Sequence, residues 1–217
     1  MPAPHPEELA GLSRSEMLRA SPTMFDTPWL DRCSRVHWTV PLVIFLPAIA
    51  ALLVLGFVHG AGIWALAWIV GGYLIWTLTE YWLHRVVFHF EADHGIAARF
   101  HWIIHGVHHD HPNDPMRLVM PPSVSVPLAG LFVSAFYLVF GSPGFFPLSA
   151  GFLGGYLGYD MLHYHVHHHH ATTRLGKLMR ELHMRHHYQD HGTGYGVSAP
   201  FWDHVFGTAP KRPANYR

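Results

Sequence analysis

The stretch His101-Trp-Ile-Ile-His-Gly-Val-His-His-Asp-His-Pro-Asn-Asp114 carries the motif around which the rest of the chain is organised. Within it, His105-x-x-His108-His109 places three imidazoles at positions i, i+3 and i+4 of a helix. Side chains at these positions lie on one face of a helix, so the three imidazoles are expected to point the same way. Three nitrogen donors on one face predict part of a metal site.

Comparable spacings recur at three other places in the chain. They are His183-x-x-His186-His187, His163-x-x-x-His167 and His84-x-x-x-x-His89. Neutral imidazole suits zinc, iron, copper and nickel, and one such ion takes about four to six ligands, so ten donors predict two ions. The i, i+5 spacing of His84 and His89 leaves two alternatives open: the helix end unwinds there, or the two histidines serve different ions.

The composition places the chain in a membrane. Of its 217 residues, 50% are hydrophobic and only 13% are charged, which is too apolar for an ordinary soluble domain. The formal net charge is zero with neutral histidines, so nothing favours binding to nucleic acid. A single cysteine, Cys33, excludes an intramolecular disulfide framework and a cysteine-based metal site.

Four apolar segments are long enough to cross a bilayer, which predicts an all-α integral membrane protein with four transmembrane helices in two hairpins. The expected spans are about 40–58, 63–82, 123–140 and 145–162, joined by tight turns at 59–62 and 141–144. Gly151, Gly154, Gly155 and Gly158 form two overlapping small-xxx-small pairs, which permit close helix contact.

All fourteen lysines and arginines fall in the segments outside these spans and outside both turns. Those segments are 1–39, 84–120 and 163–217. The positive-inside rule then predicts that both termini and the metal site are cytoplasmic, at a bacterial inner membrane or at the endoplasmic reticulum of a eukaryote. Residues 1–39 are expected to be a cytosolic or interfacial segment, and 40–217 the main domain, whose His-rich helical cap, 84–120 and 163–217, holds the two metals.

Three residues of the fourth span are candidates for contact with substrate. Asp160 precedes His163 by three positions, so it could receive the N–H of a ligand or touch substrate; its structural alternative is helix capping or pairing with an arginine. Tyr156 and Tyr159 stand just above the metal end and could shape a route for substrate, although packing in an aromatic core is the alternative for each.

Two metals held by nitrogen beneath the ends of membrane helices indicate oxidative chemistry on a lipid. An acyl chain can enter from the bilayer, and iron is the usual metal for attacking an unactivated C–H bond. A non-catalytic metal-binding membrane protein remains a different class of hypothesis. A di-haem cytochrome or a metal transporter would place ligands near the membrane midplane, where the spans have none, and the H-E-x-x-H motif of a zinc peptidase is absent.

The four histidine clusters, read as HRVVFH, HGVHH, HYHVH and HMRHH, resemble the pattern of the membrane fatty acid hydroxylase/sterol desaturase superfamily. Within it the chain is most similar to the fatty acid 2-hydroxylases that act on ceramide or sphingolipid acyl chains. The supporting stretches include WTLTEYWLHRVVFHFE, HGVHHDHPNDPMRLVMPP, GYDMLHYHVHH and MRHHYQDHGTGYGVSAPFWDHVFGT. The likeness covers about residues 25–210.

This resemblance implies O₂-dependent hydroxylation at C2 of a long acyl chain by two iron ions, with zinc as an occupant of the sites in isolated protein. It implies electrons from a cytochrome b5-like protein, or from a ferredoxin with its reductase. The 39 leading residues are too few for a cytochrome b5 domain, so the donor is expected to be a separate protein. Sterol, carotenoid or other lipid oxidation within the same superfamily is the nearby alternative.

Overall fold

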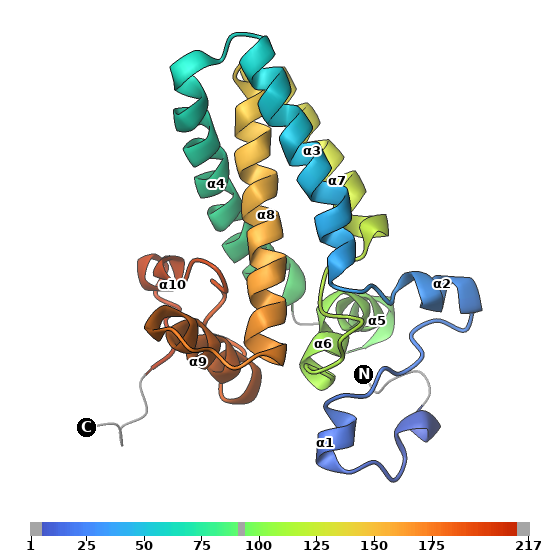
Figure 1. Ribbon diagram of the computed structural model, residues 1–217. Helices are drawn as coiled ribbons and strands as arrows, with labels where there is room; N and C mark the ends of the chain where they lie inside the picture. The colour runs from blue at the N-terminus through green and yellow to red at the C-terminus, as the bar shows by residue number, and fades with distance from the viewer. Residues whose placement is uncertain (1–5, 91–93, 212–217) are drawn as a thin grey trace.

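The fold is that of an upright bundle of long helices with a cap of short helices at one end (Figure 1). A computed structural model describes residues 6–90 and 94–211, and within these ranges all regular secondary structure is helical. The elements in chain order are η1 (Pro6–Leu9), α1 (Arg14–Met17), α2 (Pro28–Cys33), α3 (Thr39–Val58), η2 (Gly62–Trp64), α4 (Ala65–Trp82), η3 (Leu83–Phe88), α5 (Gly95–His101), η4 (Trp102–Gly106), α6 (Val107–Asp110), α7 (Pro122–Phe140), α8 (Phe145–His168), α9 (Arg174–Tyr188) and α10 (Phe201–Val205).

Within the described ranges, three stretches are long and apolar enough to cross a membrane: Thr39–Val58, Gly62–Phe88 and Pro122–Phe140. Their apolar side chains are largely exposed, as expected of surfaces that face lipid. The chain is therefore a membrane protein. The turns after α3 and after α7 lie at the same end of the bundle, and the short helices of the cap lie at the other (Figure 1).

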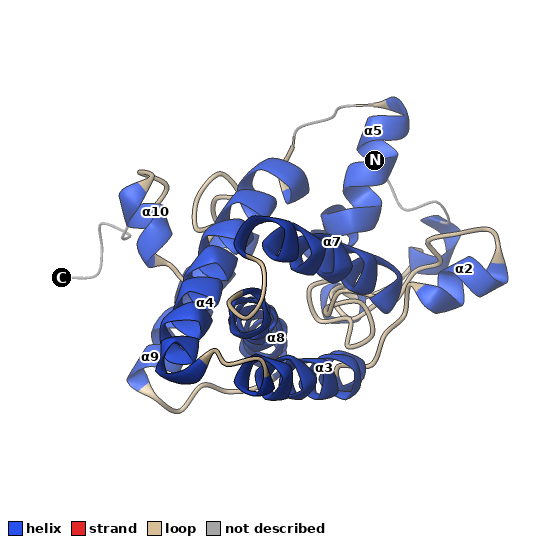
Figure 2. Cartoon of the chain, turned by 90° about the horizontal axis from the view of Figure 1, so that it is seen from above, coloured by secondary structure: helices blue, strands red, loops and turns tan. Residues whose placement is uncertain are grey.

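The fourth expected span, 145–162, is helical but differs in character from the other three. It belongs to α8, which lies between α3, α4 and α7 and packs against each of them (Figure 2). More than half of its 24 residues are buried. Because protein rather than lipid surrounds it, α8 can carry the glycines, Asp160 and histidines that lower its hydropathy.

The close packing of α8 on α4 depends on glycine. A methyl group at Gly151 would collide with the backbone carbonyl of Ile69, and one at Gly155 would collide with the ring of Trp76. At Gly154 and Gly158, by contrast, an added methyl group would meet nothing within 4 Å. Of the two small-residue pairs predicted from the sequence, only the one formed by Gly151 and Gly155 makes the contact.

The N-terminal segment is built into the cap. Met24 packs with Trp102 and Val107 in a small apolar core separate from that of the bundle. The guanidinium of Arg117 donates to the carbonyl oxygen of Pro22 and to the carboxylate of Asp31, 3.1 Å away. These contacts tie the segment before α3 to the loop that precedes α7.

Candidate metal centre

The structure brings all ten predicted histidines together in two groups of five, and the ligand nitrogens of each group lie within 4.8 Å of one another. The outer group, which includes two half-buried members, is His84, His89, His105, His109 and His186. The inner group, whose members are all buried, is His108, His163, His167, His183 and His187. Segments far apart in the sequence converge at both groups: η3, η4, α6 and α9 build the outer one, and α6, α8 and α9 the inner one.

Each H-x-x-H-H motif serves both groups, which corrects the expectation that its three imidazoles point the same way. His105 and His109 belong to the outer group, whereas His108 turns to the inner one. In the second motif the assignment is reversed: His186 alone joins the outer group. The reason is geometric, because positions i+3 and i+4 diverge by about 100° around a helix and each motif lies between the two groups.

The alternatives for His84 and His89 are resolved by a π-helical turn. Residues Leu83–Phe88 continue α4 with wider winding, and the backbone N–H of His89 donates to the carbonyl of His84 at 3.2 Å. This i→i+5 geometry stacks the two histidines on one face, so both join the outer group. A second π-helical turn, Trp102–Gly106, carries His105 into the same group.

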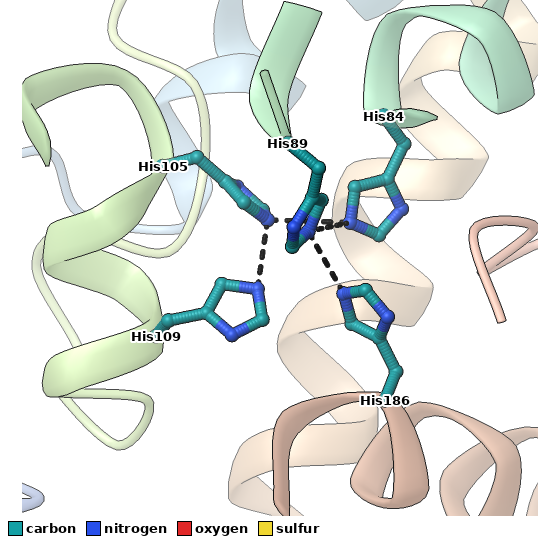
Figure 3. A group of neighbouring side chains, drawn as sticks. All are labelled: His84, His89, His105, His109 and His186. Atoms are coloured by element: carbon teal, nitrogen blue, oxygen red, sulfur yellow. Dashed lines mark hydrogen bonds between the residues drawn. The ribbon is translucent and has the colours of Figure 1, made fainter. Parts of the chain in front are cut away.

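In the outer group the Nε2 atoms face one another (Figure 3). His84 Nε2 lies 3.2 Å from His105 Nε2, and His186 Nε2 lies 3.0 Å from His89 Nε2. The Nδ1 atoms of His84 and His186 each lie 2.7 Å from a backbone carbonyl, that of Tyr195 and that of Thr193. A carbonyl can only accept, so these Nδ1 atoms carry the proton and leave the Nε2 lone pairs directed at the centre of the group.

Burial keeps the imidazoles of the cap neutral. Burial, together with neighbouring imidazoles, lowers the pKa of His89 to about 3, and burial lowers that of His186 to about 4. Burial also lowers the pKa values of His105, His108 and His187 below the ordinary histidine range. Neutral, buried donors composed of imidazole alone fit a nitrogen-preferring transition metal such as iron or zinc, and five donors suffice for one ion in each group.

A cavity of about 340 Å³ reaches both groups, because His105, His108 and His163 lie in its wall. The rest of its lining is mostly apolar. It comes from the N-terminal segment, from η3, η4 and α6, from the loop before α7 with the first turn of α7, and from α8. The apolar residues are Met24, Phe25, Trp29, Leu30, Cys33, Phe88, Ile103, Ile104, Val107, Leu118, Val119, Met120, Pro121, Val124 and Tyr159, with Ser34, Arg117, Ser123 and Asp160 as the polar exceptions. An apolar cavity ending at the histidines fits a hydrocarbon ligand.

The three substrate-contact candidates of α8 have different places. Asp160 and Tyr159 lie in the cavity wall, but Tyr156 lies in the bundle core. The Tyr156 hydroxyl donates to the carboxylate of Asp160 at 2.7 Å. Within the described residues, Asp160 does not accept the Nδ1 proton of His163, so the expected contact with a ligand N–H does not form.

Several residues of the site could not be singled out from the sequence. Arg117 and the residues of α2 line the cavity through tertiary packing, which has no local signature. The carbonyls of Thr193 and Tyr195 are backbone groups and carry no sequence signal at all. Acidic residues are few in this sequence, which offers a hint to Asp203 in the stretch FWDHVFGT. Its carboxylate accepts from the backbone N–H of Tyr195 and so holds the loop that supplies these carbonyls.

Comparison with known proteins agrees with this site. The fatty acid hydroxylase family model matches residues 69–208. The chain is 34% identical over 191 residues to the dihydroceramide fatty acyl 2-hydroxylase FAH2 of Arabidopsis thaliana, covering 87% of this chain and 80% of that protein. It is 36% identical over 189 residues to the ceramide very long chain fatty acid hydroxylase SCS7 of Saccharomyces cerevisiae, covering 83% of this chain but 47% of the yeast protein.

A solved structure of full-length scs7p, in which only the hydroxylase domain is visible, superposes with a TM-score of 0.78 at 33% identity. The match covers 84% of this chain and 70% of that one. The chain belongs to the fatty acid hydroxylase family.

Proposed function

We propose that this protein is an iron-dependent hydroxylase that uses O₂ to hydroxylate C2 of a long acyl chain in a fatty acid, a ceramide or a related lipid. The observation that carries the proposal is the apolar cavity of about 340 Å³ that ends at both histidine groups. Relatives named as dihydroceramide fatty acyl 2-hydroxylase and fatty acid 2-hydroxylase support both the position of attack and the lipid class.

The ten histidines are proposed to hold two iron ions, one in each group, and zinc can take the same positions in isolated protein. Bound iron would supply the oxidising power needed to break an unactivated C–H bond, which no side chain can supply. In the overall reaction one O₂, two electrons and two protons convert the C2–H bond into C2–OH and release one water. The apolar lining of the cavity keeps bulk water from the acyl chain while this occurs.

The cavity wall offers a means of fixing C2. Within the described residues, the Tyr159 hydroxyl has no hydrogen-bond partner, yet Tyr159 lines the cavity beside His163. It is positioned to donate to the acyl carbonyl oxygen, which would hold the adjacent C2 near the metals. Asp160, which already accepts from Tyr156, presents its remaining acceptor capacity to the amide or hydroxyl of the lipid.

The membrane arrangement follows from the same geometry. We propose that α8 is the fourth span, enclosed by the three lipid-facing ones, so that two hairpins place the His-rich cap on the cytoplasmic side. The catalytic domain is proposed to comprise 40–217, with 1–39 contributing part of the cavity wall. Electrons are proposed to come from a separate cytochrome b5-like protein or a ferredoxin with its reductase, which would reach the cap from the cytosol.

The test is product analysis. Cells that express the full chain, and cells that express His186→Ala, are compared by mass spectrometry of their lipids. The expected result is a gain of one oxygen in long acyl chains, located at C2 by fragmentation, only with the unaltered protein. Oxygen at another carbon, or in a sterol or carotenoid instead, would replace C2 hydroxylation with another chemistry of the family.

A further inference from the structure

The loop between α9 and α10 supplies both carbonyls that orient outer-group histidines. Thr193 O accepts from His186 Nδ1 and Tyr195 O accepts from His84 Nδ1, each at 2.7 Å. These two histidines come from different helices, one from α9 and one from the π-helical turn after α4. The direction of both carbonyls therefore decides where two of the five lone pairs point.

Asp203 holds the peptide group that contains the Tyr195 carbonyl. Its carboxylate accepts from the backbone N–H of Gly196 at 2.9 Å and from that of Tyr195 at 2.9 Å. The Gly196 N–H and the Tyr195 carbonyl belong to one planar peptide, and in a trans peptide they point in opposite directions. Hydrogen bonds thus run without interruption from the Asp203 carboxylate, through this peptide, to the imidazole of His84.

The second carbonyl is held from the same segment. The Gly194 N–H, in the peptide that contains the Thr193 carbonyl, donates to the carbonyl of Thr208 at 2.9 Å. The Thr208 hydroxyl in turn lies 2.8 Å from the carboxylate of Asp203. Asp203 is only 1% exposed and, in the part of the chain that the structure describes, pairs with no cation. Its charge is therefore directed at backbone N–H groups and at one hydroxyl.

The inner group has no equivalent support. The Nδ1 atoms of four of its members are buried and have no hydrogen-bond partner among residues 6–90 and 94–211: His163, His167, His183 and His187. In the outer group the Nδ1 atom of His109 is in the same state, whereas those of His84 and His186 are partnered. The orienting contacts therefore act on two histidines of the outer group and on none of these four inner ones, although the two groups share α6 and α9.

We propose that Asp203 is a positioning residue for the metal of the outer group, acting through the Tyr195–Gly196 peptide on His84. This rests on the proposed function, which assigns the histidines as metal ligands. By accepting the Gly196 N–H, the carboxylate polarises the peptide, strengthens its carbonyl as an acceptor and makes the His84 Nε2 a better donor to a metal. The two metal sites are therefore inequivalent, and only the outer one depends on Asp203.

The test is the metal content of Asp203→Asn. The amide has nearly the shape of the carboxylate but has one acceptor oxygen in place of two, so it cannot accept from the N–H groups of Tyr195 and Gly196 at once, and its NH₂ group must face one of these donors. Full-length protein in detergent is loaded with zinc or iron, dialysed and assayed for metal per chain by mass spectrometry. We expect two ions in the unaltered protein and one in Asp203→Asn, with outer-site affinity about 10- to 100-fold weaker.

The matched control is Asp114→Asn. Asp114 is also buried, at 2% exposed, and accepts a backbone N–H, that of Met116 at 2.9 Å, but in the loop before α7. It makes no contact with the loop between α9 and α10 through any hydrogen bond of the described residues. We expect Asp114→Asn to keep both ions.

Combination with ligand variants assigns the loss to a site. In His186→Ala, which removes an outer ligand, adding Asp203→Asn should change the metal content no further. In His108→Ala, which removes an inner ligand, the same addition should remove the remaining ion. General destabilisation would not produce this difference, and the ion kept by Asp203→Asn alone reports that the fold is intact.

If Asp203→Asn yields no folded protein, Thr208→Val provides the test, since it removes the hydroxyl that helps to hold the carboxylate.

Two ions in the unaltered protein and two, at unchanged affinity, in Asp203→Asn would overturn the role of Asp203 and leave the proposed function standing. Equal weakening of both sites would overturn it as well. Fewer than two ions in the unaltered protein would instead overturn the dimetal assignment itself, and with it this inference.

Discussion

At the scale of single residues, the site depends on the one-residue difference between positions i+3 and i+4. In each H-x-x-H-H motif the first and last histidines, at positions i and i+4, belong to one group, and the middle histidine, at i+3, belongs to the other. The two motifs are used in opposite senses, so each group receives three histidines from the motifs together. Each of the two helices, α6 and α9, therefore contributes ligand candidates to both groups.

Replacing one middle histidine is therefore expected to empty one group. If each group holds one ion, as proposed, His108→Ala should lose the inner ion and His186→Ala the outer one, leaving about one ion per chain in each case. Both variants should lose turnover, because the proposed reaction uses both ions. Metal analysis and product assay on the same preparations check this. The exposed His165→Ala, on α8 outside both groups, is the control. Full activity in both ligand variants would reject the assignment.

A second residue-scale prediction concerns Tyr159. Tyr159→Phe removes only the hydroxyl proposed to hold the acyl carbonyl, and a neutral hydrogen bond contributes about 0.5–1.5 kcal/mol. We expect kcat/KM to fall about 2- to 10-fold while the metal content is unchanged. Tyr164→Phe is the matched control, since Tyr164 is on the same helix but stacks on Trp38 rather than lining the cavity. Equal effects of the two changes would argue against the role of Tyr159.

The ten candidate ligands could be found from the sequence, because their spacings are local and repeated. Their division into two groups could not, because i+3 and i+4 look equivalent until the position of the neighbouring helix is known. His84 and His89 show the same limit: five-residue spacing is ambiguous, and only the π-helical turn of Leu83–Phe88 makes it a single face. The cavity could not be predicted from the sequence either, because its wall combines residues far apart in the chain, such as Trp29 and Tyr159, that only tertiary packing brings together.

At the scale of elements, the N-terminal segment acts as one wall of the cavity and is fastened by Arg117. The Arg117 side chain is 3% exposed, and that of its partner Asp31 is 14% exposed. Burial lowers the pKa of Arg117 to about 10, so the guanidinium remains charged at neutral pH. The fastening is thus a charge pair with Asp31, one contact with the carbonyl of Pro22 and one with the hydroxyl of Ser34, all made by a side chain that lines the cavity.

Arg117→Leu should release this wall. Breaking a fully buried pair costs about 3–5 kcal/mol, and the partial exposure of Asp31, which keeps its 3.0 Å contact with Arg35, reduces the expected loss to about 2–3 kcal/mol. We expect faster proteolysis within residues 20–36 and a raised KM for lipid, with both metals retained. Arg32→Leu, on the exposed side of α2, should leave protection and KM unchanged.

The contact between α4 and α8 supplies another element-scale test. Gly151→Ala places a methyl group against the carbonyl of Ile69 and should lower the free energy of unfolding by about 1–3 kcal/mol, as overpacking generally does. Gly154→Ala is an unusually close control, because it makes the same chemical change three residues away, where nothing lies within 4 Å. Unfolding in detergent, followed by circular dichroism, compares the two; similar losses would contradict the close approach at Gly151.

At the scale of the whole molecule, the bundle and the cap depend on different forces. Apolar packing around α8 holds the long helices together, with Phe45, Trp76 and Phe152 in its core. The cap instead gathers ten neutral imidazoles, whose Nε2 atoms approach one another at 2.8–3.2 Å. Lone pairs crowded in this way stabilise nothing by themselves, so bound metal is expected to supply much of the stability of the cap.

Removing the metals should therefore loosen the cap and spare the bundle. A ligand present at 100 times its Kd stabilises the folded state by about 2.7 kcal/mol, so a chelator should lower Tm by several degrees, and added zinc or iron should restore it. Hydrogen exchange should rise in α6, in α9 and in the loop between α9 and α10, while α3 and α7 remain protected within lipid or detergent. Uniform loosening of all helices, or no change at all, would show that the histidine groups are not the metal-dependent part of the fold.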